Sequence, residues 1–224
     1  EISECLVGSE MCIRDRSLIG LYPSATRSIL LNGANIHSVD IGYLPQKFGL
    51  FPGMTVRECM RYIAFSKGIS SCSLDKDIEA VIESVNLSSY IDKKAHTLSG
   101  GMVRRVGIAQ AFLGNPPIII CDEPTAGLDP EERLRFRDLI KQTNCDDKII
   151  IISTHIVDDA EFLCDYIEII DQGYIIAKDT TDGIKTAMTR LWASPSIDTS
   201  EPASADPTLE DGYMYILKSY RNGV

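Results

Sequence analysis

The chain has 224 residues and a formal net charge of −10 at pH 7, with 44% hydrophobic and 24% charged residues. This length allows one domain, or a core with a subdomain, and is sufficient to bury a real hydrophobic core. The negative charge argues against a nucleic-acid partner and against direct adhesion to an anionic membrane. No apolar run approaches the roughly 18 residues of a membrane span, so direct membrane insertion is not expected.

The cysteines are scattered along the chain and none of them forms a C-x-x-C pair. This spacing indicates neither a disulfide framework nor a zinc site, and reduced thiols are expected. Cys121 lies within an isoleucine run and is expected to be a small buried residue.

The first 16 residues show no clear periodicity and lack the features of a secretory signal peptide. One interpretation is a weak strand from Ile2 to Val7 with a charged tail. The segment also resembles the translation of a sequencing adapter joined to a truncated gene. We therefore expect residues 1–16 to be a non-native segment that should be kept out of fold reasoning.

Residues 17–54 contain two expected strands of an α/β core. The first is Ile29 to Leu31, which ends in a tight turn at Asn32-Gly33. The second begins at Ile41 and leaves into a loop at Pro45-Gln46. A glutamine in such a loop is, considered alone, an ordinary solvated residue.

Residues 55–97 have a helical pattern. Thr55-x-x-Glu58 is a capping box, which predicts the start of a helix. A second helix is expected over residues 75–85, where apolar residues recur at helical spacing. These apolar stripes are interpreted as core, and His96, which follows them, as a loop residue.

Two chemical devices lie between residues 98 and 129. Ser99-Gly100-Gly101 is a small-residue loop at an expected helix start, where free backbone N–H groups form an anion site. Ile118 to Cys121 is an apolar run typical of a buried parallel strand, and it ends in Asp122 and Glu123. Open α/β sheets place their ligands at such strand ends. Taken singly, the first could be an ordinary loop and the second a solvated strand end.

Residues 130–180 continue the α/β pattern with a helix after Pro130 and a strand from Lys148 to Ser153, which is followed by Thr154-His155. A further helix is expected from Ile156 to Cys164. Two strands around Gln172-Gly173 predict a hairpin. Residues 181–224 form a C-terminal extension with a disordered linker at 193–207, rich in Ser, Pro and Asp, before a short terminal helix.

These motifs together resemble the nucleotide-binding subunit of an ABC transporter of the bacterial exporter type. LSGGM is similar to the family's signature loop, usually LSGGQ; IIICDE is similar to its Walker B strand and AGLD to its D-loop. The resemblance implies a P-loop NTPase-like (RecA-like) α/β fold with a mainly parallel sheet. Its core would comprise residues 17–54 and 98–180, with a helical subdomain inserted at 55–97.

The resemblance also implies the roles of individual residues in binding and hydrolysing ATP with Mg²⁺. Asp122 would hold the Mg²⁺ shell and Glu123 would orient or deprotonate the attacking water. His155, which follows Glu123 by 32 positions, would contact the γ-phosphate. Gln46, in the counterpart of the Q-loop, would reach both the metal and the water.

The remaining motif residues imply a dimer. Ser99, Gly100 and Gly101 would cap the ATP held by a second nucleotide-binding subunit, and Asp129 would lie at the seam between the two. Met102 replaces the usual glutamine, which removes a polar contact beside the loop but leaves its backbone donors.

The chain lacks the phosphate-binding loop that the family uses for catalysis. It contains no G-x-x-x-x-G-K-[ST] match and no Gly-Lys pair. That loop supplies the backbone N–H groups, the lysine and the hydroxyl that hold ATP and Mg²⁺. We therefore expect a sheet without its N-terminal strands and phosphate loop, truncated before or through that loop, and no catalysis by this chain.

The family places this subunit in the cytoplasm, peripheral to the inner face of the cell membrane, on a transmembrane permease subunit. Phe48, Leu50 and Phe51 would contact that permease, or alternatively pack onto the helical subdomain. Two other functions remain open. One is a soluble ABC-type ATPase acting on ribosomes or DNA, and the other is a non-catalytic partner in an ABC ATPase heterodimer.

Overall fold

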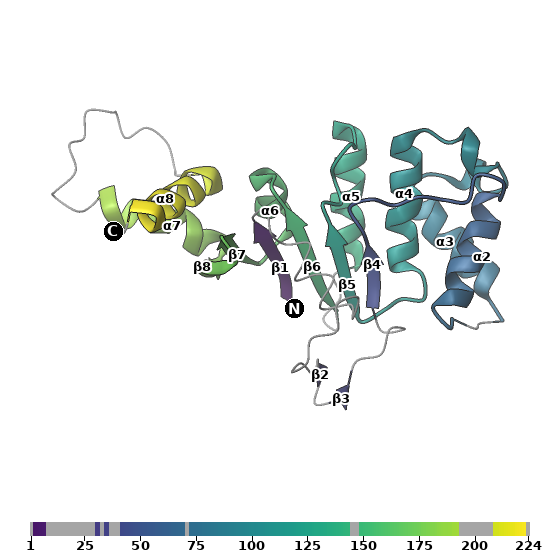
Figure 1. The fold of residues 1–224 in the computed structure, drawn as a ribbon, viewed down its shortest axis with the longest axis horizontal. Helices are drawn as coiled ribbons and strands as arrows, with labels where there is room; N and C mark the ends of the chain where they lie inside the picture. Colours follow the sequence, from purple (N-terminus) through teal and green to yellow (C-terminus); the bar gives the residue numbers. More distant parts are fainter. Residues whose placement is uncertain are drawn as a thin grey trace.

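A six-stranded sheet forms the centre of the computed structural model, which describes residues 2–7, 30–31, 34–35, 41–69, 72–143, 148–192 and 208–222 (Figure 1). The strand order is β4-β5-β6-β1-β7-β8. The strands are β1 (Ile2–Val7), β4 (Ile41–Leu44), β5 (Ile118–Asp122), β6 (Ile149–Thr154), β7 (Tyr166–Asp171) and β8 (Tyr174–Thr180). All neighbours pair in parallel except β8, which is antiparallel to β7. The expected α/β class with a mainly parallel sheet is confirmed.

Two neighbouring apolar strands, β5 and β6, lie in the interior of this sheet. Every residue of β5 is buried, as the isoleucine run predicts for a strand covered on both faces. Its partner β6 continues the pattern in parallel register, with Ile119 opposite Ile150 and Cys121 opposite Ile152. Cys121 is fully buried, as expected from its sequence context.

The N-terminal strand β1 requires a correction. It lies between β6 and β7 and is parallel to both, with Ile2 opposite Ile149 at one end and Val7 opposite Thr154 at the other. We expected a sheet without its N-terminal strands, but β1 contributes an N-terminal strand to the sheet. The weak strand at Ile2–Val7 is present, and pairing on both sides supplies the stabilisation that its own sequence pattern does not indicate. The non-native origin of residues 1–16 stays a prediction.

The segment predicted to form a helical subdomain lies at the right of Figure 1. It comprises α2 (Val56–Ser66), α3 (Leu74–Ser84) and two short 3₁₀ turns, Ser88–Tyr90 and Ala95–Thr97. The predicted capping box is confirmed: the Glu58 N–H donates to Thr55 Oγ1 at 3.2 Å, and the Thr55 N–H donates to Glu58 Oε2 at 2.6 Å. Ile78 and Ile82 of α3 are fully buried, so the helical stripe is core, as interpreted.

Three further helices follow the order of the chain: α4 (Gly100–Phe112), α5 (Pro130–Thr143) and α6 (Val157–Leu163). α4 packs closely on β4. This approach requires glycine at position 42, because a Cβ there would lie 1.9 Å from the Ala111 carbonyl oxygen.

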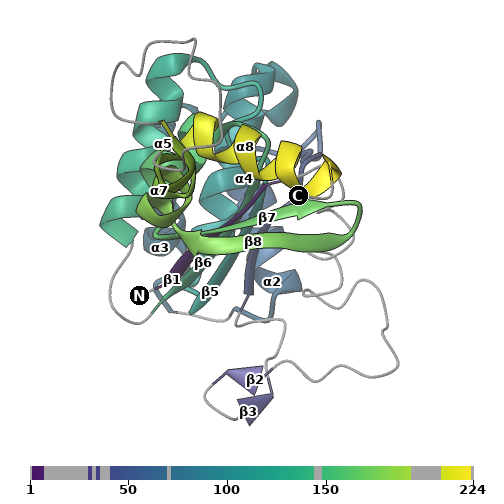
Figure 2. The same ribbon diagram turned by 90° about the vertical axis from the view of Figure 1, so that its left-hand side faces the viewer.

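The C-terminal extension contains α7 (Thr181–Trp192) and α8 (Leu209–Asn222), which pack against each other. Figure 2 shows α8 crossing beside the β7–β8 hairpin, to which an ion pair from Arg221 Nη2 to Asp171 Oδ1, at 2.9 Å, connects it. The small hairpin of β2 (Leu30–Leu31) and β3 (Ala34–Asn35) lies apart from the main sheet. The predicted turn at 32–33 and the linker at 193–207 lie outside the described residues.

A buried polar network joins three segments near the end of β5. Asp159 of α6 is 1% exposed. Its Oδ2 accepts a hydrogen bond from Thr125 Oγ1 at 2.5 Å, and its Oδ1 forms an ion pair with Arg137 Nη2 of α5 at 2.8 Å. The Arg137 guanidinium lies 4.4 Å above the ring of Phe162. One carboxylate thus fixes α5, α6 and the loop after β5 together.

Replacing Asp159 is expected to destabilise the fold strongly. Asp159→Ala leaves the guanidinium of Arg137 buried without its counter-charge, and loss of one partner of a buried pair costs about 3–5 kcal/mol. Urea unfolding should show this loss in the free energy of unfolding. Asp158→Ala, at the exposed neighbouring position of the same helix turn, should cost less than about 1 kcal/mol. Equal losses in the two variants would contradict the role given to the network.

The buried amine of Lys67 should make stability depend on pH in the alkaline range. Lys67 Nζ donates to the Gln110 carbonyl at 2.7 Å, and burial lowers the pKa of Lys67 to about 8. Between this pKa and that of an unfolded lysine, about 10.4, the unfolded chain binds more protons. The free energy of unfolding should therefore rise by about 3 kcal/mol from this group as pH increases across that window.

Urea titrations at several pH values test this expectation. Lys67→Met should remove this part of the rise, whereas Lys76→Met, at an exposed position of α3, should retain it. A rise of the same size in the Lys67→Met variant would assign the pH dependence to other groups.

Candidate functional site

The predicted site residues lie at the edge of the sheet where the parallel strands end. Gln46 follows β4, Asp122 ends β5 with Glu123 directly after it, and His155 follows β6. Because β4, β5 and β6 are neighbours in parallel register, their carboxyl ends meet at one edge. This is the position at which open α/β sheets bind ligands.

Glu123 and His155 are brought into direct contact. The Glu123 N–H donates to the Ser153 carbonyl at 2.9 Å, which extends the pairing of β5 with β6 by one residue. Glu123 Oε1 then lies 2.6 Å from His155 Nδ1. The Glu123 side chain is 17% exposed and the His155 side chain is 70% exposed. The carboxylate is therefore largely buried, whereas the imidazole faces the solvent.

The backbone of Glu123 is strained. Its φ is +51°, in the left-handed region that residues with a Cβ rarely adopt. Such strain persists only when the surroundings hold it, and it is concentrated at functional sites. Here it turns the chain sharply out of β5 while the side chain contacts His155.

Asp122, the last residue of β5, is more deeply buried than Glu123. Its side chain is buried, and Oδ1 accepts a hydrogen bond from Ser153 Oγ at 3.0 Å. Across the described residues, no group of three or more His, Cys, Asp or Glu side chains is arranged to hold a metal ion. Mg²⁺ is usually bound by one or two carboxylates together with water and substrate phosphates, a mode for which one carboxylate at this edge is sufficient.

The start of α4 has the geometry of an anion site. Ser99 is the N-cap residue, and its Oγ accepts a hydrogen bond from the Met102 N–H at 3.2 Å. Met102 is predicted to lose a polar contact, but its Sδ accepts a weak hydrogen bond from the Ser99 N–H at 3.5 Å. Gly100 is exposed, and a Cβ at this position would meet no atom within 4 Å. A ligand can therefore approach the backbone of this loop closely.

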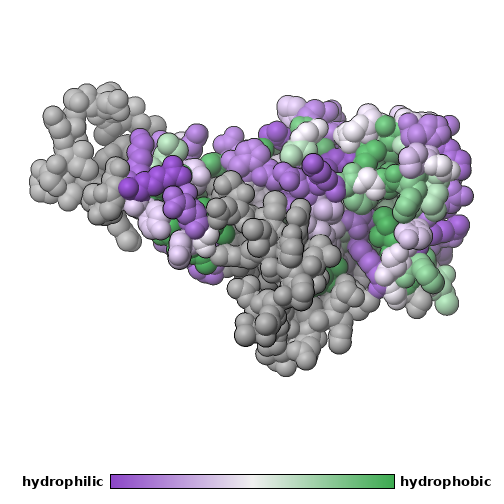
Figure 3. Space-filling model, viewed as in Figure 1, coloured by the Kyte–Doolittle hydropathy of each residue, from purple (hydrophilic) through white to green (hydrophobic). Residues whose placement is uncertain are grey.

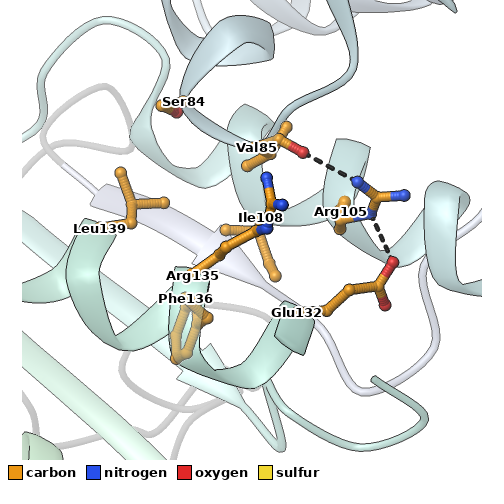
Figure 4. Close-up of a pocket in the computed structure, with 8 residues that line it drawn as sticks. All are labelled: Ser84, Val85, Arg105, Ile108, Glu132, Arg135, Phe136 and Leu139. Atoms are coloured by element: carbon orange, nitrogen blue, oxygen red, sulfur yellow. Dashed lines mark hydrogen bonds and ion pairs between the residues drawn. The ribbon is translucent and has the colours of Figure 1, made fainter. Parts of the chain in front are cut away.

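A glutamate of α5 connects α4 to the loop before α5. Asp129 Oδ1 accepts a hydrogen bond from the Glu132 N–H at 2.9 Å and so caps α5. Glu132 Oε1 forms an ion pair with Arg105 Nε of α4 at 2.9 Å, and the Arg105 Nη1 donates to the Val85 carbonyl at 3.1 Å (Figure 4). Glu132 thus contacts Asp129 through its backbone N–H and Arg105 of α4 through its carboxylate.

The apolar residues after Gln46 differ in their burial. Phe48 and Leu50 are partly buried and pack against the core cluster, which agrees with the alternative of packing on this chain itself. Phe51 is 49% exposed, and its ring lies 5.1 Å from that of Tyr62, edge to face. Tyr62 and Phe65 of α2 are also exposed. Figure 3 shows hydrophobic residues at the right of the molecule, where α2 lies in Figure 1.

Sequence reasoning missed Arg104. This arginine of α4 is 8% exposed, and its guanidinium donates to main-chain carbonyls of the segments that carry Gln46 and Glu123. No signal in the sequence separates it from Arg105, because both follow the glycine loop at helical positions. Gln46 itself is exposed, and its carbonyl, 2.9 Å from Arg104 Nη1, connects it to the rest of the site. His96 is a loop residue, as interpreted, with Nδ1 2.9 Å from the Pro52 carbonyl oxygen.

The chain matches the family model described as "ABC transporter" over residues 16–126. It is 38% identical over 167 residues to "Linearmycin resistance ATP-binding protein LnrL" of Bacillus subtilis, and the match covers 72% of this chain and 54% of that protein. It is 34% identical over 169 residues to "Nod factor export ATP-binding protein I" of Cupriavidus pinatubonensis, covering 73% and 52%. The chain thus spans about half the length of these curated relatives.

Solved structures share the fold. "Structure of ATP binding subunit of ABC transporter" has a TM-score of 0.79 at 24% identity, over 96% of this chain and 88% of that one. "Dimeric structure of a post-hydrolysis state of the ATP-binding cassette MJ0796 bound to ADP and Pi" has a TM-score of 0.70 at 23% identity, over 80% and 85%. The P-loop NTPase fold expected from the motifs is therefore confirmed.

Within the described part of the chain, no helix has both the length and the apolar character needed to cross a membrane. Members of the matched family bind ATP and are ATPases, and their ATP-binding domains dimerise and pair with transmembrane subunits. From its motifs, fold and relatives, this chain belongs to the family of ABC transporter ATP-binding subunits.

Proposed function

We propose that this subunit belongs to an exporter, in which hydrolysis of ATP powers transport through a separate transmembrane permease. The observation that carries the proposal is the contact of 2.6 Å between Glu123 and His155 at the carboxyl edge of the parallel sheet. A carboxylate and an imidazole held together beside an anion site can position a water and a phosphate.

Each residue at this edge has a proposed role in the reaction. Glu123 orients or deprotonates the attacking water, and His155 contacts the γ-phosphate. Asp122 binds the Mg²⁺ shell, because a buried carboxylate next to the reacting phosphates suits this hard cation. Gln46 reaches the metal and the water from the neighbouring strand end. Phosphoryl transfer depends on positioning and charge neutralisation, so these residues act together.

The working unit is proposed to be a dimer of nucleotide-binding subunits. The start of α4 offers backbone donors at Ser99, Gly100 and Gly101 to an ATP held by the opposite subunit. Asp129 is proposed to lie at the seam, and Glu132, whose N–H donates to Asp129, forms an ion pair with Arg105 of α4. The solved MJ0796 cassette, which shares this fold, is dimeric in its post-hydrolysis state, and this supports the arrangement.

The partner in the membrane is proposed to bind the exposed aromatic side of the helical subdomain. The large hydrophobic side chains of Phe51, Tyr62 and Phe65 are 49%, 51% and 82% exposed in this chain. A subunit held there would sit in the cytoplasm at the inner face of the cell membrane. The names of two relatives, one in Nod factor export and one in linearmycin resistance, support an export role.

A non-catalytic role in a heterodimer is the second candidate. It is favoured by the lack of any G-x-x-x-x-G-K-[ST] match in the chain. Such a partner would offer only its signature loop to an active subunit. The intact Glu123–His155 pair favours the catalytic role, because a subunit that donates only a signature loop has no use for it.

The 224-residue chain is expected to bind ATP weakly and not to hydrolyse it. Loss of a single preorganised donor costs about 10²–10³ in rate, and a phosphate loop supplies several donors and a lysine. Titration with a fluorescent ATP analogue and a phosphate-release assay with Mg²⁺ test both parts. ATPase activity of this chain that Glu123→Gln abolishes would overturn the expectation.

A chain carrying a phosphate loop ahead of Ser17 should hydrolyse ATP. In that chain Glu123→Gln should lower the rate of phosphate release by at least about 10²-fold, the order expected for a positioned general base. Glu131→Gln, at an exposed position of α5, is the matched control and should leave the rate unchanged.

A further inference from the structure

The guanidinium of Arg104 satisfies all of its donors with main-chain carbonyls. Five N–H groups are available on an arginine side chain, and each finds an acceptor here. Nε donates to Pro124 at 3.3 Å, Nη1 to Pro45 at 2.7 Å and Gln46 at 2.9 Å, and Nη2 to Asp122 at 2.8 Å and Glu123 at 2.5 Å.

This placement is costly for a cation. Arg104 is 8% exposed, and burial lowers the pKa of its guanidinium, which the nearby negative groups oppose. A buried charge requires dense hydrogen bonding to offset its lost hydration. An apolar side chain would fill the same space without that cost, but it would leave the five carbonyls without these donors. Position 104 therefore requires the several N–H donors of a guanidinium, and an apolar side chain of the same size would not be equivalent.

The acceptors belong to two loops that are far apart in sequence. Pro45 and Gln46 follow β4, whereas Asp122, Glu123 and Pro124 end β5 and begin the next loop. Glu123 is the residue with the left-handed φ of +51°. Its carbonyl accepts from Arg104 while its N–H is held by Ser153, so both sides of the strained residue are fixed.

We propose that Arg104 is a positioning residue for Glu123 and Gln46 and that it couples them to the glycine loop at the start of α4. Arg104 lies on the second turn of that helix, five residues after Ser99. A shift of the helix when a nucleotide binds at its start would move the guanidinium and, through it, both loops. The catalytic meaning of this coupling rests on the proposed function. The geometric coupling itself can be tested without ATP.

Histidine NMR on the full chain provides the test. The ring of His155 reports on Glu123, because the two side chains are 2.6 Å apart, and His96 serves as an internal reference beside Pro52. Arg104→Lys keeps a charge but cannot supply the five-donor fork, and Arg104→Met removes all donors. Arg133→Lys is the matched control, since Arg133 Nε donates to the Leu128 carbonyl and contacts neither Glu123 nor Gln46.

Both Arg104 variants should move or broaden the His155 ring signals, Met more than Lys, while the His96 signals stay in place. Arg133→Lys should move neither, and His155→Gln assigns the signal. If Arg104→Met does not fold, Arg104→Lys decides the question alone. Unchanged His155 signals in a folded Arg104 variant, or equal shifts of His96, would overturn the proposal. ATPase measurements play no part in this readout, so a failure of the proposed function would be seen separately.

Discussion

The parallel register of β5 with β6 is the constraint on which the site depends. Asp122 lies opposite Ser153, and the next N–H along the chain, that of Glu123, still donates to the Ser153 carbonyl. This shared edge brings a carboxylate and an imidazole separated by 32 positions to a distance of 2.6 Å. A slip of one residue would send alternate side chains to the opposite face and separate the pair.

A second constraint is the direction of α4. The helix precedes β5 and reaches it through a short connection, so it runs back along the sheet and begins near the edge where β5 ends. Its glycine loop therefore lies on the same side as Glu123, and the contact of Arg104 with the Glu123 carbonyl confirms this proximity. The start of α4 and the Glu123–His155 pair are thus held close together on one helix and one pair of strands.

Three buried or partly buried side chains, Glu132, Asp159 and Arg104, connect the segments that carry the motifs. Glu132 joins the loop at Asp129 to Arg105 of α4, and Asp159 joins the loop after β5 to α5 and α6. Arg104 joins the ends of β4 and β5. These contacts connect α4 to the strand ends, and the coupling proposed for Arg104 depends on them.

Local patterns predicted most of the elements. The capping box at Thr55 defined the start of α2, and the isoleucine runs predicted β5 and β6 because a strand buried on both faces leaves a continuous apolar signature. The hairpin at Gln172-Gly173 followed from its turn residues, both of which have positive φ. The identities of Asp122, Glu123 and His155 followed from motif resemblance, and their roles in hydrolysis remain proposals.

By itself, the amino-acid sequence predicted the order of most elements, since helices and strands depend on periodicity and local spacing, whereas the fold family and the identities of the site residues followed from the resemblance of its motifs to a known family. Only the tertiary structure decided the place of β1, which depends on pairing with two strands more than 140 residues away. It alone revealed Arg104, whose acceptors lie as far as 59 residues from it in the chain. Such partners meet through the sheet, and no local pattern records them.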